Sequence, residues 1–545
     1  MRNPVASGAA WAWLLPVLVL GLACSLWFLP FTLDDPYVSF RYASHLASGS
    51  GLVFNPGERV EGYSNLLWTL LLAAVIRAGG DPLLWSKLIG VGLQLLTIAV
   101  LWWCVRELLS GMRTSRRLRD VGALLAATAY AVSWYPSLWS VGSLETPLFT
   151  ALLLLAFAAV LRDRVVAAAL LLLLAALTRP EGVLFFAVFL CVLVLGHLRS
   201  HRRLPAPRLL ARWTAPFAVP YATFIAWRLA YYGSPLPNTY YDKSGGALGL
   251  TLRGGVGYLA SFVTTSFGGG PAIPTEPGVR VSQVVGVAAI LAAALALLVW
   301  RMVCRGRLPL GLATAWVGIT FTAILLEGGD WMPGFRFAIP AYPFLVLLAA
   351  VGFALVLRRL PARPRALRPA TVPCAVAVLA LISGMQMRTV EEQVPWLRPI
   401  VQVGRVTPEA SYRAVASWLQ EHVAAGSLVA IEEAGLIPYY ADDLRYLDLF
   451  GLTDARLARA PGQPPFGKED NAYVLGRRPD CVLLWEDVHA DGALFAPHAT
   501  LLRDPTFAQR YRLLLTLPRG PADQRGTRSR FLVYGRKDFT PVSRG

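Results

Sequence analysis

Long apolar runs, separated by short polar segments, fill the first 387 residues of the chain. A helix needs roughly 20 apolar residues to cross a bilayer, with about 17 as a practical lower limit. The pattern predicts eleven membrane-spanning helices. They are Gly8–Leu33, Leu88–Val105, Val121–Leu144, Thr146–Leu161, Val165–Thr178, Gly182–Leu198, Trp213–Trp227, Val281–Trp300, Leu308–Leu326, Phe337–Leu357 and Pro369–Met387.

A further uncharged run, Gly62–Ile76, is short for a span. Counting it as a span would place the first basic loop on the other side of the membrane from the remaining basic loops. We therefore interpret it as a re-entrant or interfacial segment.

After Met387 the pattern changes to that of a soluble domain, residues 388–545. Ser411–Ala425 has the periodicity of an amphipathic helix. Five short alternating or apolar runs predict strands, so we expect a small α/β domain. The strands are Ser427–Glu432, Leu444–Leu449, Asp480–Trp485, Tyr511–Leu517 and Arg530–Gly535, and Gly462–Asp470 and Pro518–Ser529 are predicted as loops.

The composition fits a membrane protein, since 55% of the residues are hydrophobic and 15% are charged. The net charge of +18 would suggest nucleic acid as a partner, but its distribution argues against one. Residues 1–387 hold 31 basic and 14 acidic residues, whereas residues 388–545 hold 20 and 19. Most of the basic residues in the first part lie in loops between spans, as expected of cytoplasmic loops.

That orientation places the polar motifs and the C-terminal domain on the outer face of a bacterial cytoplasmic membrane. The first helix, Gly8–Leu33, is longer than a signal-peptide core and runs into acidic residues without a cleavage pattern. We expect an uncleaved anchor. The six cysteines form no CxxC pair, and Walker, GxGxxG, HExxH and GxSxG motifs are absent from the sequence, so it indicates neither zinc nor nucleotide chemistry.

Asp34 and Asp35 follow the first predicted span directly. Adjacent carboxylates at a membrane surface can act as a general base toward a hydroxyl or ligate a divalent metal, Mg²⁺ or Mn²⁺. The alternative is a solvated helix end with a capping aspartate. On the helical face that follows, Arg41 could clamp a phosphate, pair with Asp34 or Asp35, or anchor an interfacial helix to lipid headgroups. His45 is expected to be structural.

Three further outer loops carry ionisable groups. Glu145 and the pair Arg179 and Glu181 stand at helix ends, where an ion pair is the structural interpretation and substrate contact the functional one. The same two interpretations apply to a turn that contains Gly-Gly and Pro, with the residues Glu327, Asp330 and Arg336.

The loop Tyr231–Lys243 combines four tyrosines with amide and charged groups. A sugar stacks its C–H face on aromatic rings and needs convergent polar partners for its hydroxyls. An interfacial aromatic belt is the structural alternative. We predict sugar or phosphate contacts from Tyr232, Asn238, Tyr240, Tyr241 and Lys243.

Taken in order, these motifs resemble the bacterial GT-C membrane glycosyltransferases related to the mycobacterial terminal arabinofuranosyltransferase. The segments are LDDPYVSFRYASHLASGSGLVFNPGERVEGYSNLLW, GSLETPLF, LTRPEG, YYGSPLPNTYYDK, GGDWMPGFRF and, in the C-terminal domain, EEAGLIPYYADDLRYLDLFGLTD. The resemblance implies a multi-spanning enzyme that moves a sugar, with arabinofuranose as one candidate, from a polyprenyl-phosphate donor to a glycan or protein acceptor. It places Asp34 and Asp35 at the catalytic motif.

The C-terminal motif would either hold the acceptor or pack against the membrane domain. Its candidate residues are Glu432, Glu433, Tyr439, Tyr440, Asp448 and Asp454. Two rival functions are a transporter or flippase of lipid-linked oligosaccharides and a non-catalytic envelope assembly protein. A transporter would carry charges or broken helices near the membrane midplane, whereas this chain gathers its ionisable residues on one face.

Overall fold

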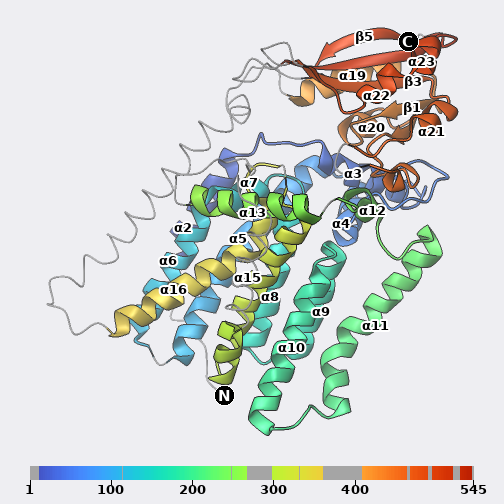
Figure 1. The fold of residues 1–545 in the computed structure, drawn as a ribbon. Coiled ribbons are helices and arrows are strands. Elements are labelled where there is room, and N and C mark those ends of the chain that lie inside the picture. Colours follow the sequence, from blue (N-terminus) through green and yellow to red (C-terminus); the bar gives the residue numbers. More distant parts are fainter. Residues whose placement is uncertain are drawn as a thin grey trace. The chain divides into compact units, whose positions relative to one another are not determined.

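The computed structural model describes residues 12–112, 114–246, 248–266, 297–330, 332–359, 408–462, 467–488, 494–519 and 528–542 (Figure 1). The chain forms two compact units, each built from three stretches of sequence. The membrane unit comprises Met1–Pro30, Ser86–Thr223 and Leu248–Val394, and the sheet unit comprises Phe31–Trp85, Phe224–Ala247 and Pro395–Gly545. These units differ from the predicted division of the chain at Met387. Phe31–Trp85 and Phe224–Ala247 come before Met387 but belong to the sheet unit.

The described part of the membrane unit is helical. Among the residues that the structure describes, four helical segments are long and apolar enough to cross a membrane, as befits a multi-pass membrane protein. They are Pro82–Gly111, Gly182–His201, Leu308–Glu327 and Arg336–Arg358. The helices that lie in this unit or enter it are α2 (Leu14–Trp27), α5 (Pro82–Gly111), α6 (Arg116–Ala131), α7 (Trp134–Ser140), α8 (Thr146–Leu161), α9 (Val165–Thr178), α10 (Gly182–His201), α11 (Pro207–Tyr232), α13 (Leu248–Ser266), α15 (Leu308–Glu327), η1 (Arg336–Ala341) and α16 (Tyr342–Arg359).

Large aromatic side chains fill the core between these helices. Trp316 of α15 is fully buried, and its ring lies edge-on to Phe344 of α16, with a centroid separation of 5.3 Å. Its indole N–H donates to the Phe185 carbonyl at 3.1 Å. Because a buried indole N–H needs an acceptor, this bond fixes how α15 packs against α10.

The prediction of one span over Val121–Leu144 is wrong. α6 ends at Ala131 and α7 begins at Trp134, with Ser133 extended between them. Pro136 explains the break, since a proline fits only in the first turn of a helix and Pro136 stands in the first turn of α7. The predicted span Pro369–Met387 and most of Val281–Trp300 lie outside the described residues, so the number of eleven spans stays a prediction.

The sheet unit contains a mixed six-stranded sheet with the strand order β2-β1-β3-β6-β5, and β4 pairs with β3. β1 is parallel to β2 and β3, whereas β6 is antiparallel to β3 and β5. The strands are β1 (Leu428–Ile431), β2 (Arg445–Asp448), β3 (Cys481–Val488), β4 (Leu494–Phe495), β5 (Tyr511–Pro518) and β6 (Arg528–Arg536).

Five strands and one helix of this unit lie where the sequence predicts them. The amphipathic helix expected over Ser411–Ala425 is α19, Pro408–His422. β4 was not predicted, because its two residues are too few to show an alternating pattern. The predicted loops Gly462–Asp470 and Pro518–Ser529 lie partly outside the described residues, at 463–466 and 520–527.

The remaining elements of the sheet unit are short. The run Gly62–Ile76 contains α4 (Leu66–Arg77), whose 12 residues extend about 18 Å and so fall short of a bilayer's hydrocarbon core. The others are α3 (Asp35–Ala47), α12 (Asn238–Lys243), α20 (Leu436–Tyr440), η4 (Leu457–Arg459), α21 (Asn471–Gly476), α22 (Ala499–Arg503) and α23 (Pro505–Arg510).

Candidate functional site

The acidic motif lies at the N-terminus of α3 and is fastened to the loop that follows β1. One carboxylate oxygen of Asp34 accepts the Gly435 N–H at 3.0 Å, and the other accepts the Leu436 N–H at 2.6 Å. The first turn of a helix leaves such N–H groups without partners inside the helix. Asp34 therefore caps α20 from a distant part of the sequence.

Only glycine fits at residue 435. A Cβ there would lie 2.1 Å from the Asp34 carbonyl oxygen and 2.5 Å from its Oδ2. The glycine of the motif EEAGLIPYY thus has a steric role, since it lets the backbone approach the Asp34 carboxylate.

Burial raises the pKa of the Asp34 carboxyl well above its ordinary value, and the nearby charge of Glu433 raises it further. The hydrogen bonds from Leu436 and Gly435 act in the opposite direction, because they stabilise the charged form. Asp35, the first residue of α3, is half-buried.

Arg41 is 1% exposed, and its guanidinium donates to three carbonyl oxygens. These belong to Phe54 at 2.9 Å, Leu444 at 3.0 Å and Pro438. Two aromatic rings, Phe54 and Tyr446, flank the cation at 5.0 Å each. Arg41 therefore ties α3 to α20 and to the segment before β2. Because its side chain is enclosed by the protein, it is not an anchor to lipid headgroups.

The tyrosines of both motifs complete the junction between α3 and α20. The ring of Tyr37 lies 5.4 Å from that of Tyr439 and 5.7 Å from that of Tyr440. His45 is buried and its Nδ1 lies 2.9 Å from the Val53 carbonyl oxygen, as expected of a structural histidine. Tyr439 and Tyr440 of the C-terminal motif thus pack against α3, within the sheet unit, and an acceptor-binding role for the motif stays a prediction.

Glu433, next to this junction, forms an ion pair with Arg519. Arg519 also donates to the Tyr412 hydroxyl at 3.2 Å, and its guanidinium lies 4.2 Å from the centre of the Trp485 ring. Nothing in the sequence singles out Arg519, Tyr412 or Trp485. Their positions at the end of β5, in α19 and in β3 are brought together only by the fold.

The loop Tyr231–Lys243 mostly turns its polar groups inward. The Asn238 amide donates to the carbonyl oxygens of Gly451 at 2.7 Å, Leu452 at 3.0 Å and Asp454 at 3.2 Å. The Tyr232 hydroxyl donates to the Leu52 carbonyl at 2.8 Å.

The other members of this loop differ in exposure. Arg459 lies over the Tyr241 ring at 3.9 Å, whereas Tyr240 and Lys243 are exposed. Asn238, Tyr232 and Tyr241 therefore hold the loop to the sheet unit. Tyr240 and Lys243 are the two predicted contacts that face outward.

Asp242 is buried between charged neighbours in the same loop. It is 6% exposed, and the charges that act on it most strongly are those of Asp448, Lys243 and Lys468. Burial raises the pKa of Asp242 to about 7, with a contribution from the Asp448 charge. Burial also raises the pKa of Asp448 to about 6, although Thr453 bonds its carboxylate.

A buried ion pair that the sequence does not indicate lies nearby. Glu61 and Arg228 are 2.8 Å apart and both are buried. Two motif positions flank it, since the Asn238 N–H donates to the Glu61 carbonyl at 2.8 Å and Arg228 donates to the Pro235 carbonyl at 3.2 Å. The two charged residues are 167 positions apart, so no local spacing could have revealed the pairing.

In the membrane unit, Arg179 bridges two carboxylates. It lies 3.1 Å from Glu145 and 2.7 Å from Glu181, and its guanidinium is 5.1 Å from the Phe337 ring. Burial alone would raise the pKa of Glu181, but the charge of Arg179 and its hydrogen bond hold that pKa below its ordinary value. The ion pair that the sequence suggests is therefore present.

A second ion pair joins Arg336 and Asp330 at 2.9 Å. Arg336 also lies 5.5 Å from the Trp139 ring. A small cavity of about 20 Å³ beside Arg179 is lined by Glu181, Glu327 and the ring of Phe337, among others. The polar residues predicted at these helix ends of the membrane unit thus pair with one another.

The donor set does not match a preformed metal site. Both Asp34 oxygens accept backbone N–H groups, and within the described ranges no three His, Cys, Asp or Glu residues gather closely enough to hold a metal. A metal bound at Asp34 or Asp35 would have to take most of its ligands from substrate and water.

The family model that matches the chain is a domain of unknown function (DUF8728), over residues 402–534. No curated protein matches the sequence.

Solved structures match over nearly the whole chain. ArnT from Cupriavidus metallidurans bound to undecaprenyl phosphate matches with a TM-score of 0.53 and 15% sequence identity, and the match covers 97% of this chain and 98% of ArnT. The apo state of ArnT matches with a TM-score of 0.51 and 15% identity, and this match covers 96% of this chain and 98% of ArnT. The oligosaccharyltransferase of Archaeoglobus fulgidus in its apo form has 0.51 and 13%, covering 93% of this chain and 80% of that one. At these identities the likeness concerns the fold, and this chain has a membrane GT-C fold with a C-terminal sheet domain.

Proposed function

We propose that this chain is a glycosyltransferase that takes a sugar from a polyprenyl-phosphate donor and adds it to a glycan or protein acceptor at the outer face of the cytoplasmic membrane. The observation that carries the proposal is the acidic motif at the start of α3, held by the sheet unit, in a chain with the fold of ArnT and of an oligosaccharyltransferase. A structure of ArnT contains undecaprenyl phosphate, which supports a lipid-linked donor.

Within the motif the two aspartates have different roles in this proposal. Asp34 is the positioning residue, because both its oxygens bond the backbone of the β1–α20 loop. Asp35 is the general base. The acceptor hydroxyl oxygen attacks the anomeric carbon, the bond from that carbon to the phosphate oxygen breaks with its electron pair leaving on the polyprenyl phosphate, and the hydroxyl proton moves to the Asp35 carboxylate.

Lys243 is the phosphate contact that we favour in the sheet unit. Its ammonium is exposed, whereas Arg41 is enclosed by carbonyl groups. Tyr240, also exposed, is the candidate stacking residue for a sugar. Arg179 and Arg336 stay candidate substrate contacts of the membrane unit, although carboxylates hold both. Arabinofuranose is the sugar that the sequence motifs suggest.

The test is transfer by the purified full chain in nanodiscs, from a panel of synthetic polyprenyl-phosphate sugars. Release of polyprenyl phosphate is measured for the wild type, Asp35→Asn, Asp34→Asn and Lys243→Gln, with Mg²⁺, with Mn²⁺ and with EDTA. Asp442→Asn is the matched control, since Asp442 is an exposed aspartate of the sheet unit.

We expect one donor to be used, and Asp35→Asn to lower kcat by at least about 100-fold, the usual scale for a general base. Lys243→Gln should raise KM more than it lowers kcat. Full activity of Asp35→Asn would remove it as the base. If no donor turns over while the chain translocates a lipid-linked glycan, the transporter is correct, and binding without either activity would indicate an assembly protein.

A further inference from the structure

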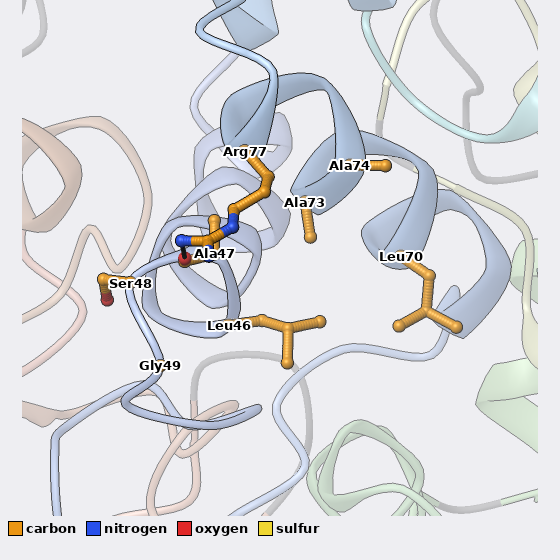
Figure 2. A pocket seen from close by; sticks show the side chains of 8 residues that line it. All are labelled: Leu46, Ala47, Ser48, Gly49, Leu70, Ala73, Ala74 and Arg77. Atoms are coloured by element: carbon orange, nitrogen blue, oxygen red, sulfur yellow. Dashed lines mark hydrogen bonds between the residues drawn. The ribbon is translucent and has the colours of Figure 1, made fainter.

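A surface groove lies between the C-terminal end of α3 and the side of α4, both within the sheet unit (Figure 2). Its volume is about 570 Å³. It is at the opposite end of α3 from Asp34, and the 13 residues of the helix separate the two by about 20 Å. The proposed catalytic motif therefore does not include it.

The groove has an apolar floor and one cationic end. Figure 2 shows the side chains of Leu46 and Leu70 extending toward each other from the two helices, with Ala73 beside them. Arg77 reaches across from the last turn of α4 and donates a hydrogen bond of 3.3 Å to the Ala47 carbonyl. A guanidinium has five N–H donors, so this bond leaves it able to bind a ligand as well.

The position of Arg77 along the chain matches the level of lipid headgroups. Five residues later, at Pro82, α5 begins, which is long and apolar enough to cross a membrane. Its first turns expose Leu84 and Trp85, and an exposed tryptophan at a helix end is typical of the membrane interface. Leu70, which is exposed, would then face acyl chains.

We propose that this groove binds an anionic phospholipid of the surrounding bilayer, with the lipid phosphate on Arg77 and part of an acyl chain along Leu46 and Leu70. The carbonyl ends of α3 and α4 each carry about half a negative charge whose effect falls off within the last turn, whereas the Arg77 guanidinium can contact the phosphate directly. The site is independent of the proposed transferase activity.

The test is native mass spectrometry of the full chain in detergent, titrated with phosphatidylglycerol or phosphatidylcholine. We expect tighter binding of the first phosphatidylglycerol, and Arg77→Gln to weaken it about five-fold, the scale of one basic residue at a lipid surface. Arg77→Lys should keep most of the preference, and Leu70→Gln should weaken both lipids. Arg503→Gln, at an exposed arginine of α22, is the matched control.

Two results would overturn the proposal. One is an unchanged phosphatidylglycerol affinity in Arg77→Gln and Leu70→Gln variants that melt at the wild-type temperature. The other is displacement of the bound lipid by undecaprenyl phosphate together with an equal rise of the donor KM in Arg77→Gln, which would assign the groove to the donor. Failure of the transferase assay alone would leave these binding constants unaffected.

Discussion

At the scale of single residues, backbone groups hold Asp34 of the acidic motif. Asp34 takes two N–H groups of the β1–α20 loop, and Arg41 takes three carbonyl groups around the same junction. Backbone partners hold a side chain in one orientation, because a backbone N–H or carbonyl group moves only when its whole helix or loop moves. The two residues thus fix the start of α3, and with it Asp35.

Gly435→Ala should misplace the motif without unfolding the domain. The added methyl group would overlap Asp34 atoms at 2.1 and 2.5 Å, so the carboxylate must leave its two N–H partners. We expect transferase activity to fall at least about ten-fold, equivalent to about 1.4 kcal/mol in the transition state. Gly426→Ala is the control, because a Cβ there would meet no atom within 4 Å, although its positive φ makes a small loss of stability expected. Unchanged activity of Gly435→Ala would show that the hydrogen bonds from Gly435 and Leu436 to Asp34 are not needed for transfer.

Arg41→Met should destabilise the sheet unit strongly. The methionine keeps the apolar stem but leaves three buried carbonyl oxygens without donors, at about 1–3 kcal/mol for each unsatisfied group. We expect a cost of about 3 kcal/mol, measured as a lower melting temperature of the purified chain. If Arg41→Met melts normally yet loses donor affinity, Arg41 is a phosphate contact after all.

At the scale of elements, the loop that carries α12 is docked on η4 by buried polar groups. Asn238 bonds three carbonyl groups, and the Lys468 ammonium bonds the carbonyl oxygens of Tyr241 at 2.5 Å and Ala458 at 3.0 Å. Asp242 lies in this contact beside Asp448. A negative charge on Asp242 is unfavourable beside the Asp448 carboxylate, so the stability of the docked loop depends on whether Asp242 is protonated.

Asp242→Asn should make the docked loop less sensitive to pH. The pKa of Asp242 is raised from 3.8 to about 7 in the folded chain, so the folded state holds this proton more tightly than the unfolded state does. The contribution of Asp242 to the free energy of unfolding is therefore largest below about pH 4, declines as the pH rises and levels off above about pH 7. At pH 8 the amide should stabilise the chain by up to about 4 kcal/mol.

The measurement is the melting temperature of the wild type, Asp242→Asn and the exposed control Asp443→Asn between pH 4 and pH 8. The difference between the wild type and Asp242→Asn should grow with pH, whereas the control should follow the wild type. A difference that is the same at all pH values would mean that Asp242 is ionised throughout.

At the scale of the whole molecule, the side of the membrane on which the polar loops lie follows from the basic loops and stays a prediction. A cysteine at Lys243 tests it, because this side chain is exposed. In intact cells, Lys243→Cys should react with a membrane-impermeant maleimide, and Arg202→Cys, in the basic loop after α10, should react only after the cells are opened. Both variants are made after replacing Cys191, which is exposed. The reverse labelling would place the site in the cytoplasm.

The sequence by itself determined the elements whose signal is local. Apolar length predicted α5, α10 and α15, and short alternating or apolar runs predicted the five main strands of the sheet, because both signals depend on the residues within one segment. It also identified Asp34, Arg179 and Asn238 as members of polar motifs. The sequence did not reveal which backbone groups these side chains bond, because the spacing of residues in one segment carries no information about which distant segment approaches it.

Tertiary structure decided which of those polar residues hold the fold and which stay exposed. Arg41 and Asn238 had the chemistry of ligand-binding groups, yet carbonyl groups more than 200 residues away take their donors. Lys243, predicted as a contact in the same loop as Asn238, instead remains exposed. Buried polar groups must find partners within the protein, and only the folded chain determines which groups are buried.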